Sequence, residues 1–505
     1  MRVVRQLGVG VEAFDADLHG GGWGNGYTIS LAEKRVLTVA GVPPEACAYA
    51  LARYSRSPDS IAASLEWVRA HDSSKFLDSF YFQYGHASIA DLGHLVFCFE
   101  GISELAATEI EDEQLWDGQA RSSRYQDFSR SGFLTPAELN DRQVEIYQHA
   151  GLDLLAAYEK VHAHVFEHLT AKLPKPAEMK PEAYQRNLAA RAFDVARYLL
   201  FFGVPTGVGQ VVSIRTLERQ IARLRGSEYI ELRQLADEMV RACAEKPDCV
   251  WDPSVAHAPL APTLAKYCEA DPHRRQATAD LKLWAKQNLP HAAGARIDDV
   301  DLLKPSNTAA DIVATLLYPV TDRPFRELYD LACKWSEARR AEVIDVVMQS
   351  RARKDDLLRE FRGNLYAYDI VMDIGAYRDL HRHRRCQQFR QAYSGRLGYE
   401  TPAAVGEAGV ADTYHDAMRS AFAAIGQLPE PGSHYLMPFG ARSRFLFKMD
   451  FAEAEYISRL RSGVKGHFSY RNVAWRMRER MAALEPELGR LIEATPPWVE
   501  DPLTR

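Results

Sequence analysis

Two stretches of this chain, far apart in the sequence, resemble each other, and this internal repeat limits the possible folds more than any other feature. Ala196–Arg225 reads ARYLLFFGVPTGVGQVVSIRTLERQIARLR, and Ser433–Arg461 reads SHYLMPFGARSRFLFKMDFAEAEYISRLR. YLLFFG matches YLMPFG, IARLR matches ISRLR, and the spacing between these anchors differs by one residue. An apolar run with strand character precedes each stretch, HLVFCFEGI in the first half and LYAYDIVMDIG in the second. Because these features recur in the same order, we predict two homologous domains in tandem.

The boundary between the halves is expected near KQNLPHAAGARIDDVDLLKPS, where Pro290 and Gly294 interrupt a helical pattern and DDVDLLK opens a strand. We therefore predict a first domain over residues 1–285 and a second over residues 286–505. Helical spacing of apolar residues dominates elsewhere, as in PEAYQRNLAARAFDVARYLLFF, FRELYDLACKWSEARRAEVIDVVMQ and YRNVAWRMRERMAALEPEL. The predicted fold class is α+β, with each domain rich in helix around a small, mostly antiparallel sheet.

The composition indicates a globular protein and argues against a nucleic-acid-binding one. The 62 Lys and Arg residues are outnumbered by 68 Asp and Glu residues, which gives a net charge of −6. A protein that grips a nucleic-acid backbone is usually basic overall. No apolar run approaches membrane-spanning length, and the seven cysteines lack zinc-site spacing. We expect a cytoplasmic protein with free thiols, no metal site and no membrane contact.

A basic stretch, DLHRHRRCQQFRQAYSGR (Asp379–Arg396), interrupts this acidic chain. Arg378 and Arg382 are four residues apart, so both lie on one face of a helix that ends at Arg382, His383 and Arg384. Such a fan of guanidinium groups suits phosphate oxygens or the electron-rich ring of a reduced flavin. From these residues alone, a solvated basic helix end that relieves the helix dipole is an equal alternative.

The order of the motifs around this stretch resembles that of the flavin-dependent thymidylate synthases, the ThyX family. The resemblance rests on Arg-His-Arg followed by a Ser-x-Arg loop, on YGHASIADLGHLVFCFEGI, on QARSSRY and on SIRTLERQIARLR. It covers most of both halves, so the chain resembles a tandem duplication of the family's domain. It implies conversion of dUMP to dTMP with methylenetetrahydrofolate as carbon donor. It also implies FAD, reduced by NADPH, as the hydride carrier, and a homotetramer whose sites are shared between subunits.

Neither half keeps the whole family pattern. In the first half, Asp112, Glu113 and Gln114 stand where Arg-His-Arg should be. In the second half, Ala392 replaces the substrate-loop serine in an ungapped match, unless Ser394 and Arg396 serve after a two-residue insertion. His434 replaces the arginine equivalent to Arg197, and Asp450 replaces a flavin-contacting asparagine. These losses are complementary, because each half keeps what the other lacks.

The resemblance therefore implies one composite active site per chain, in which the two halves pair as two subunits would. Chains would associate as a homodimer, forming a pseudo-tetramer. The catalytic residues expected are Ser122, Arg124 and Arg382. The cofactor-binding residues expected are Arg382, His383, Arg384, His86, Ser88 and Arg461. The substrate-binding residues expected are Arg378, Ser122, Ser123, Arg124, Arg197, Arg225 and Arg461. Cys386, two residues past Arg384, is interpreted as an ordinary thiol, since the family chemistry needs no cysteine nucleophile.

Three other functions compete with dUMP methylation. The first is flavin-dependent C5 alkylation of another pyrimidine nucleotide. The second is a non-catalytic descendant that binds a nucleotide or flavin, which the acidic replacement in the first half favours. The third is nucleic-acid binding through HRHRR, which the acidic net charge opposes.

Overall fold

The computed structural model describes residues 37–55, 57, 60–71, 87–263, 268–270, 276, 287, 299–318, 321, 323–349, 351, 357–501 and 503. Residues Met1–Val42 and Pro43–Arg505 separate into two units, and every element below belongs to the second. The predicted boundary between residues 285 and 286 lies outside the described residues. Within the described part, no helix has the length and hydropathy needed to cross a membrane.

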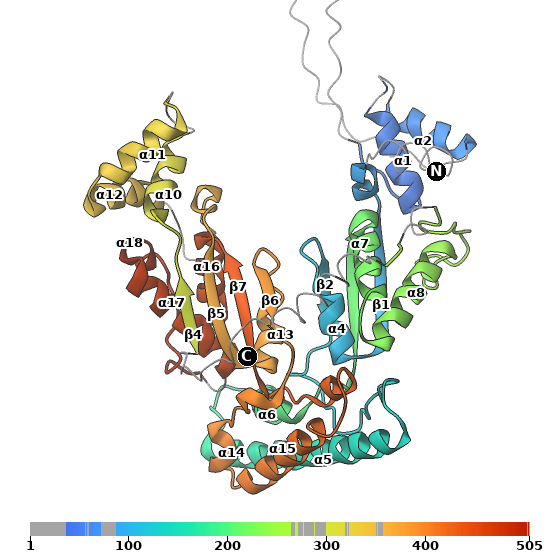
Figure 1. The fold of residues 1–505 in the computed structure, drawn as a ribbon, viewed down its shortest axis with the longest axis vertical. Coiled ribbons are helices and arrows are strands. Elements are labelled where there is room, and N and C mark those ends of the chain that lie inside the picture. The colour runs from blue at the N-terminus through green and yellow to red at the C-terminus, as the bar shows by residue number, and fades with distance from the viewer. Residues whose placement is uncertain are drawn as a thin grey trace, which may run out of the picture. The chain divides into compact units, whose positions relative to one another are not determined.

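The first half contains α1 and α2, followed by a sheet and its helices (Figure 1). Its elements are α1 (Pro44–Tyr54), α2 (Ile61–Ala70), η2 (Ala87–Leu92), β1 (His94–Ser103), α4 (Glu104–Ile110), β2 (Asp117–Ala120), α5 (Asp141–Lys172), α6 (Pro181–Ala196), η3 (Arg197–Leu199), β3 (Pro205–Ser213), α7 (Ile214–Arg225) and α8 (Ile230–Ala244).

The second half begins with strand β4 and three helices and then repeats the same order. Its elements are β4 (Val300–Leu303), α10 (Thr308–Leu317), α11 (Phe325–Lys334), α12 (Glu337–Met348), η6 (Arg359–Phe361), β5 (Tyr366–Asp373), α13 (Ile374–Leu380), β6 (Gln387–Arg390), η7 (Gly395–Leu397), α14 (Ala403–Glu407), α15 (Ala411–Ile425), η8 (Gly432–Leu436), β7 (Arg442–Met449), α16 (Phe451–Arg461), α17 (Phe468–Leu484) and α18 (Pro486–Gly489).

The two sheets have the same topology. Their strand orders are β1-β3-β2 and β4-β5-β7-β6, and all strand pairs are antiparallel. The register also corresponds, since Ser103 pairs with Pro205 just as Asp373 pairs with Arg442. The predicted α+β class, with a small antiparallel sheet in each helix-rich half, is therefore confirmed. The additional edge strand β4 confirms the strand expected in DDVDLLK.

Each strand that leads directly into a helix ends in a short polar residue that caps the helix. Ser103 and Asp373 accept hydrogen bonds from the backbone N–H groups that open α4 and α13. Ser213 and Asp450 do the same for α7 and α16. A side-chain oxygen at this position satisfies a backbone donor that the first helical turn leaves free. These caps fix where each helix begins and therefore which side chains point into the sites described below.

The stretches with helical periodicity do not form single continuous helices. Residues 325–349 form α11 and α12, because Ser336 accepts a hydrogen bond from the backbone N–H of Arg339 and starts a new helix. The final pattern ends at Leu484, before Pro486, whose ring cannot continue the backbone hydrogen bonds.

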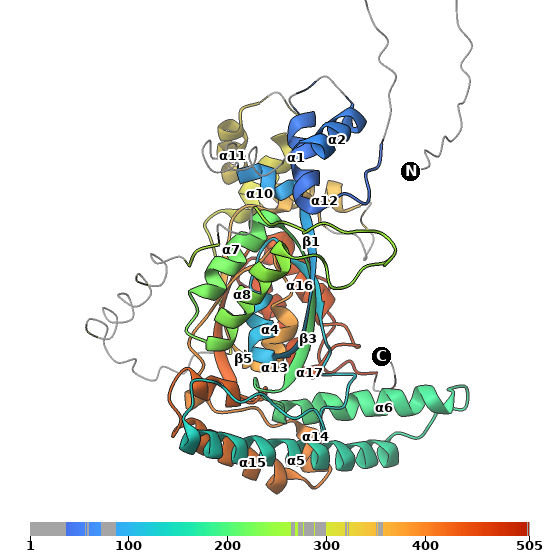
Figure 2. The same ribbon diagram turned by 90° about the vertical axis from the view of Figure 1, so that its right-hand side faces the viewer.

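The two halves pair through equivalent segments. The backbone N–H of Gly203 donates to the carbonyl of Tyr435 (2.6 Å), and the N–H of Gly440 donates to the carbonyl of Tyr198 (2.9 Å). These four residues occupy matching positions of the repeat, so the contact is reciprocal, as in a two-fold dimer. Helix α5 also packs along α15, its counterpart, as both ribbon views show (Figures 1 and 2).

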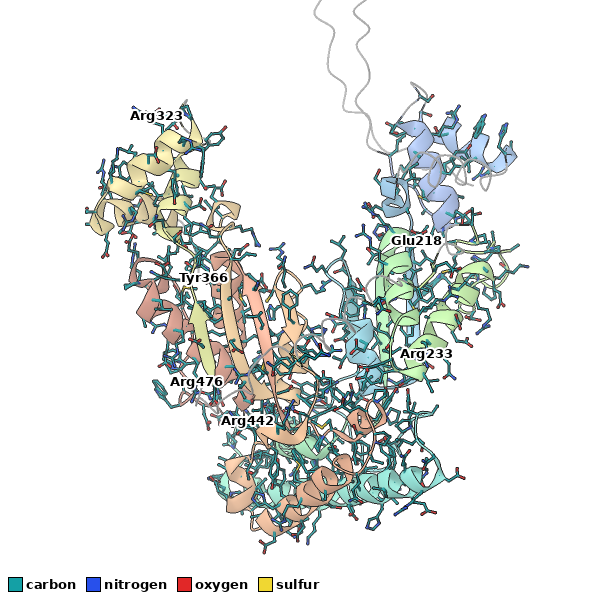
Figure 3. All side chains as sticks on the ribbon, in the orientation of Figure 1. Glu218, Arg233, Arg323, Tyr366, Arg442 and Arg476 are labelled. Carbon is teal, nitrogen blue, oxygen red and sulfur yellow. The ribbon has the colours of Figure 1, made fainter. Side chains whose placement is uncertain are left out.

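One hydrophobic core spans both halves. Phe202 and Val204 of the first half belong to the same buried cluster as Leu436, Phe439 and Ala441 of the second. A second core belongs to the β4-β5-β7-β6 sheet. Outside that core, Asp299 fixes the start of β4 by accepting hydrogen bonds from Arg442 (2.5 Å) and Arg476 (2.8 Å), both labelled in Figure 3.

Candidate active site

Four arginines from both halves surround one carboxylate, that of Asp379 on α13. Arg197 Nη1 donates to Asp379 Oδ2 at 3.0 Å, and Arg124, Arg378 and Arg382 act on the same carboxylate electrostatically. Burial raises the pKa of Asp379, but the four guanidinium groups outweigh burial and hold that pKa below its usual value. We call Arg124, Arg197, Arg378, Arg382 and Asp379 the arginine cluster.

Arg124 and Ser123 of the first half's loop contact residues of the second half. Arg124 Nε donates to Asp194 at 2.8 Å, and its Nη1 donates to the hydroxyl of Tyr470 at 2.9 Å. Arg378 Nη1 donates to the hydroxyl of Ser123 at 3.3 Å. The hydroxyl of Ser122 accepts from the backbone N–H of Arg124, which shapes the loop. The structure therefore brings together residues that the sequence placed in opposite halves.

Arg197 has unused donors despite its burial. Its side chain is 1% exposed, and Nε and Nη2 have no hydrogen-bond partner among the described residues. Gly375 leaves room beside them, since a Cβ there would lie 3.4 Å from Nη2. Buried donors are normally satisfied, so two unused ones on a buried cation favour an anionic ligand.

Beside the cluster lies a cavity of about 700 Å³, which we call the Arg-His-Arg cavity. Its wall combines Arg382–Arg385 with first-half residues that include Trp116, Asp117 and Val211–Ser213. Arg384 donates to Asp117 at 2.7 Å and lies 5.6 Å from the ring centroid of Trp116. Arg382 is exposed and belongs to both the cavity and the cluster, so it connects the two.

His383 lines this cavity and also positions another arginine. Its Nε2 accepts from Arg461 Nε at 2.7 Å, so Nδ1 carries the proton and donates to Glu453 at 3.3 Å. Burial lowers the pKa of His383, and the neighbouring Arg461 lowers it further against the opposing hydrogen bond to Glu453. The imidazole is therefore neutral at neutral pH and holds Arg461 over the ring of Tyr470, 5.8 Å from its centroid.

A larger cavity of about 1040 Å³ lies where the roles of the two halves are exchanged, so that the first half supplies the residues that match Arg-His-Arg. Asp112, Glu113 and Gln114 line it together with Ala392 and His434, so the structure joins the altered positions of both halves. We call this the carboxylate cavity. Arg223 Nε donates to Glu113 at 2.9 Å, a contact that corresponds to the one between Arg461 and His383.

Two expected site residues, Arg225 and Ser88, belong neither to the arginine cluster nor to the wall of the Arg-His-Arg cavity. Arg225 instead donates to Asp237 (2.8 Å) and to the carbonyl of Cys268 (2.7 Å). This corrects the match of Arg225 with Arg461: β3 and β7 align without a gap, so the extra residue falls within α7 and turns Arg225 away. Ser88 is exposed on η2 and does not line the Arg-His-Arg cavity, although Asp91 of the same helix does. His86 lies outside the described residues.

Sequence reasoning missed the acidic partners of the site. Asp194 and Asp379 orient Arg124 and Arg197, and Glu104 pairs with Arg378. Burial raises the pKa of Glu104 more than Arg378 lowers it. The only available signal was the spacing of Asp379, one residue after Arg378 and three before Arg382. Among the described residues, no group of three or more His, Cys, Asp or Glu side chains could hold a metal ion.

Known proteins resemble this chain over most of its length. A UPF0159 protein of Chlamydia muridarum is 24% identical over 433 residues, which cover 82% of this chain and 78% of that protein. A UPF0159 protein of Thermoplasma acidophilum is 23% identical over 486 residues, covering 88% and 94%.

Two solved structures also match, each over less than half of this chain. A UMP/dUMP methylase, PolB, from Streptomyces cacaoi, bound with 5-Br dUMP, has a TM-score of 0.32 at 15% identity and covers 38% of this chain and 94% of its own. Thymidylate Synthase X from Helicobacter pylori, with FAD and dUMP, has a TM-score of 0.27 at 16% identity and covers 39% and 88%.

The profile of the family described as "Thymidylate synthase complementing protein" (Thy1) matches residues 37–247 and 324–487. The two matched segments contain the equivalent strands of the two sheets, β1 to β3 and β5 to β7, and together make up most of the chain. The chain therefore belongs to the Thy1 (ThyX) family and carries the family's domain twice.

Proposed function

We propose that this protein is a flavin-dependent methyltransferase that acts on C5 of a pyrimidine nucleotide, and that its reaction is the synthesis of dTMP from dUMP. Membership of the Thy1 family supports the reaction class. The observation that carries the proposal is the arginine cluster beside the Arg-His-Arg cavity, joined by Arg382. An anion site next to a large cavity suits a nucleotide beside a flavin.

In this proposal the Arg-His-Arg cavity holds FAD. Arg382 and Arg384 would bind the cofactor, and Arg382, whose side chain makes no hydrogen bond or ion pair within the described part of the chain, has donors to offer. Bound FAD, reduced by NADPH, supplies the hydride, and methylenetetrahydrofolate supplies the carbon. Guanidinium groups also stabilise negative charge in such a site, because they are oriented before the reaction begins. His383 keeps Arg461 in place through the 2.7 Å hydrogen bond.

The arginine cluster would bind the nucleotide. Arg124, Arg197 and Arg378 are held in a fan by Asp194, Asp379 and Glu104, so their guanidinium planes are fixed before a ligand arrives. The two unused donors of Arg197 fit phosphate oxygens. Ser122 and Ser123 would contact the base or sugar from the loop of the first half.

The proposal assigns one active site to each chain. The carboxylate cavity presents Asp112 and Glu113 where the other cavity presents Arg382 and His383. Carboxylates repel the phosphates of both FAD and dUMP, so this cavity would not hold either.

The first experiment is to saturate the purified protein with FAD and measure bound flavin per chain, followed by methylation assays with dUMP, UMP and dCMP. We expect about one FAD per chain and turnover of dUMP. Arg382→Ala should lose flavin binding and activity. Arg396→Ala is the matched control, because that exposed arginine follows the same motif and its side chain is hydrogen-bonded, within the described residues, to Ser394 alone.

Two FAD per chain would contradict the single-site proposal. Full flavin binding by Arg382→Ala would remove the Arg-His-Arg cavity as the flavin site. Turnover of UMP or dCMP in preference to dUMP would replace thymidylate synthesis by methylation of another pyrimidine, and absence of flavin binding would favour a non-catalytic descendant.

We also infer that two chains associate as a pseudo-tetramer in the cytoplasm. Val96 and Val211 pair across β1 and β3 and are 67% and 42% exposed, an apolar sheet surface that suits a second copy. Light scattering should give about twice the chain mass of 56.9 kDa.

A further inference from the structure

The carboxylate cavity contains polar atoms that the protein itself does not satisfy. Glu111, His381 and Tyr393 are 9%, 5% and 3% exposed, and all three line the cavity. Glu111 Oε1, His381 Nε2 and the Tyr393 hydroxyl have no hydrogen-bond partner among the described residues. Unsatisfied polar atoms of buried side chains are uncommon in native proteins, so three around one cavity indicate a ligand.

The hydrogen bonds around His381 determine which of its nitrogens carries the proton. The side-chain amide nitrogen of Gln388 donates to the carbonyls of Leu380, His381 and His383, so the Gln388 Oε1 is an acceptor. That oxygen lies 3.0 Å from His381 Nδ1, which must therefore donate. The Tyr377 hydroxyl oxygen, also at 3.0 Å, can accept from the same N–H. In the neutral imidazole, Nε2 is consequently a free acceptor.

The charges of the cavity also favour a ligand that donates hydrogen bonds. Of the arginines that line the cavity, Arg223 pairs with Glu113, Arg390 with Glu109 and Arg384 with Asp117. The fourth, Arg219, is exposed, and its charge is offset by that of Glu228, which is also exposed and lines the same cavity. By contrast, Glu111 and Asp112 make no ion pair with Arg or Lys within the described part. Asp112 Oδ1 lies 3.9 Å from His381 Nε2, too far for a direct hydrogen bond. A donor that reaches both atoms would satisfy them together.

We propose that the carboxylate cavity is a second ligand site, which binds a small organic cation of the amidine or guanidine class and excludes phosphates. A guanidinium group is planar, always charged and carries five N–H donors, which match the acceptors Glu111 Oε1, Asp112 and His381 Nε2. The acceptors of this site, Glu111, Asp112 and His381, are not among the residues proposed to bind flavin or nucleotide, although Arg384 lines both cavities.

The test uses agmatine as the probe and full-length protein saturated with FAD. Isothermal titration calorimetry should detect agmatine binding to the wild type. Asp112→Asn and Glu111→Gln should each weaken agmatine about tenfold or more, because each replaces a charged acceptor by an amide of the same shape. Glu238→Gln is the control, since it removes the same charge from the exposed face of α8, where Glu238 pairs with Arg241. Bound FAD per chain should be the same in all three variants.

Absence of agmatine binding, or equal affinity in wild type and Asp112→Asn, would overturn the proposal. Displacement of agmatine by inorganic pyrophosphate would overturn the claim that phosphates are excluded. Circular dichroism checks that both variants fold. If Glu111→Gln does not fold, Asp112→Asn alone tests the proposal, because Asp112 is half-buried and its substitution disturbs the fold less. Loss of FAD alone would count against the proposed function and not against this site.

Discussion

At the scale of single residues, one carboxylate holds the proposed nucleotide site together. Asp379 is bonded to Arg197 and lies within the field of three further arginines. Without it, four guanidinium groups would repel one another in a largely buried region. A buried charge whose partner is removed is strongly destabilising, typically by about 3–5 kcal/mol.

Asp379→Asn should therefore lower the free energy of unfolding at pH 7 by about 3 kcal/mol, measured by urea denaturation. The folded-state pKa of Asp379 is lowered, so its stabilising effect is present above the pKa of the unfolded chain, about 3.9, and is lost as pH falls through the folded value. The difference between variant and wild type should shrink below about pH 4. The exposed ion pair of Asp416 supplies the control, since Asp416→Asn should change stability by less than about 0.5 kcal/mol. A pH-independent difference would show that Asp379 acts by packing alone.

The cysteines lead to a second prediction at this scale. Burial raises the pKa of Cys386, and the same effect raises the pKa of Cys243 to about 12. Cys98, Cys249 and Cys333 are exposed. Cys98 shares the exposed face of β1 with Val96, which the second copy is proposed to cover. A thiol reagent should therefore label Cys249 and Cys333 in the native protein within minutes, and the buried thiols only after denaturation, because the thiolate is the reactive form. Rapid labelling of Cys386, identified by peptide mass spectrometry, would contradict its interpretation as an unreactive thiol.

At the scale of elements, the reciprocal backbone pairing around Gly203 and Gly440 joins the halves and thereby creates both cavities. A Cβ on Gly203 would lie 2.0 Å from the Tyr147 hydroxyl and 3.2 Å from the carbonyl of Tyr435. A Cβ on Gly440 would lie 2.7 Å from Met418. Glycine is required here because the backbones of two halves approach closely.

Gly203→Ala should accordingly destabilise the protein by about 3 kcal/mol through overpacking, and should weaken FAD binding because the wall of the Arg-His-Arg cavity comes from both halves. Gly209→Ala in strand β3 is the matched control, since its Cβ would meet only Cys98 Sγ at 3.9 Å. Thermal denaturation and flavin titration measure the two effects. Equal stability of the two variants would show that the Gly203 contact adapts without cost.

At the scale of the whole molecule, the two repeated halves share one hydrophobic core. The larger core mixes buried side chains of both halves, including Val161 of α5 and Met418 of α15. Neither half can bury this surface alone, so unfolding one exposes the core of the other.

Calorimetry of the full chain should show one main cooperative transition, although large proteins often unfold in several. Gly203→Ala should move that transition to lower temperature as a unit. Two separated transitions that respond independently to Gly203→Ala would show that the halves unfold as separate domains in spite of their common core.

The sequence alone determined the features whose causes are local. Matching anchors that recur in the same order predicted the doubled unit, and apolar periodicity predicted its α+β class. The match to residues 37–247 and 324–487 confirmed the family recognised from the motifs. Interrupted helices were missed because a single N-cap serine, Ser336, outweighs continuous periodicity.

Only the tertiary structure decided how the site is assembled. The site forms because two segments distant in sequence pair reciprocally. This pairing brings first-half residues to second-half residues, namely Ser123, Arg124 and Arg197 to Arg378 and Arg382, and no local sequence pattern predicts it. On α7, Arg223 and not Arg225 contacts Glu113, because two residues apart on a helix means about 200° around its axis and the two side chains point in different directions. The role of Asp379 as the acidic partner could not be predicted for the same reason, because it depends on which side chains of the first half lie next to Asp379 in the folded protein.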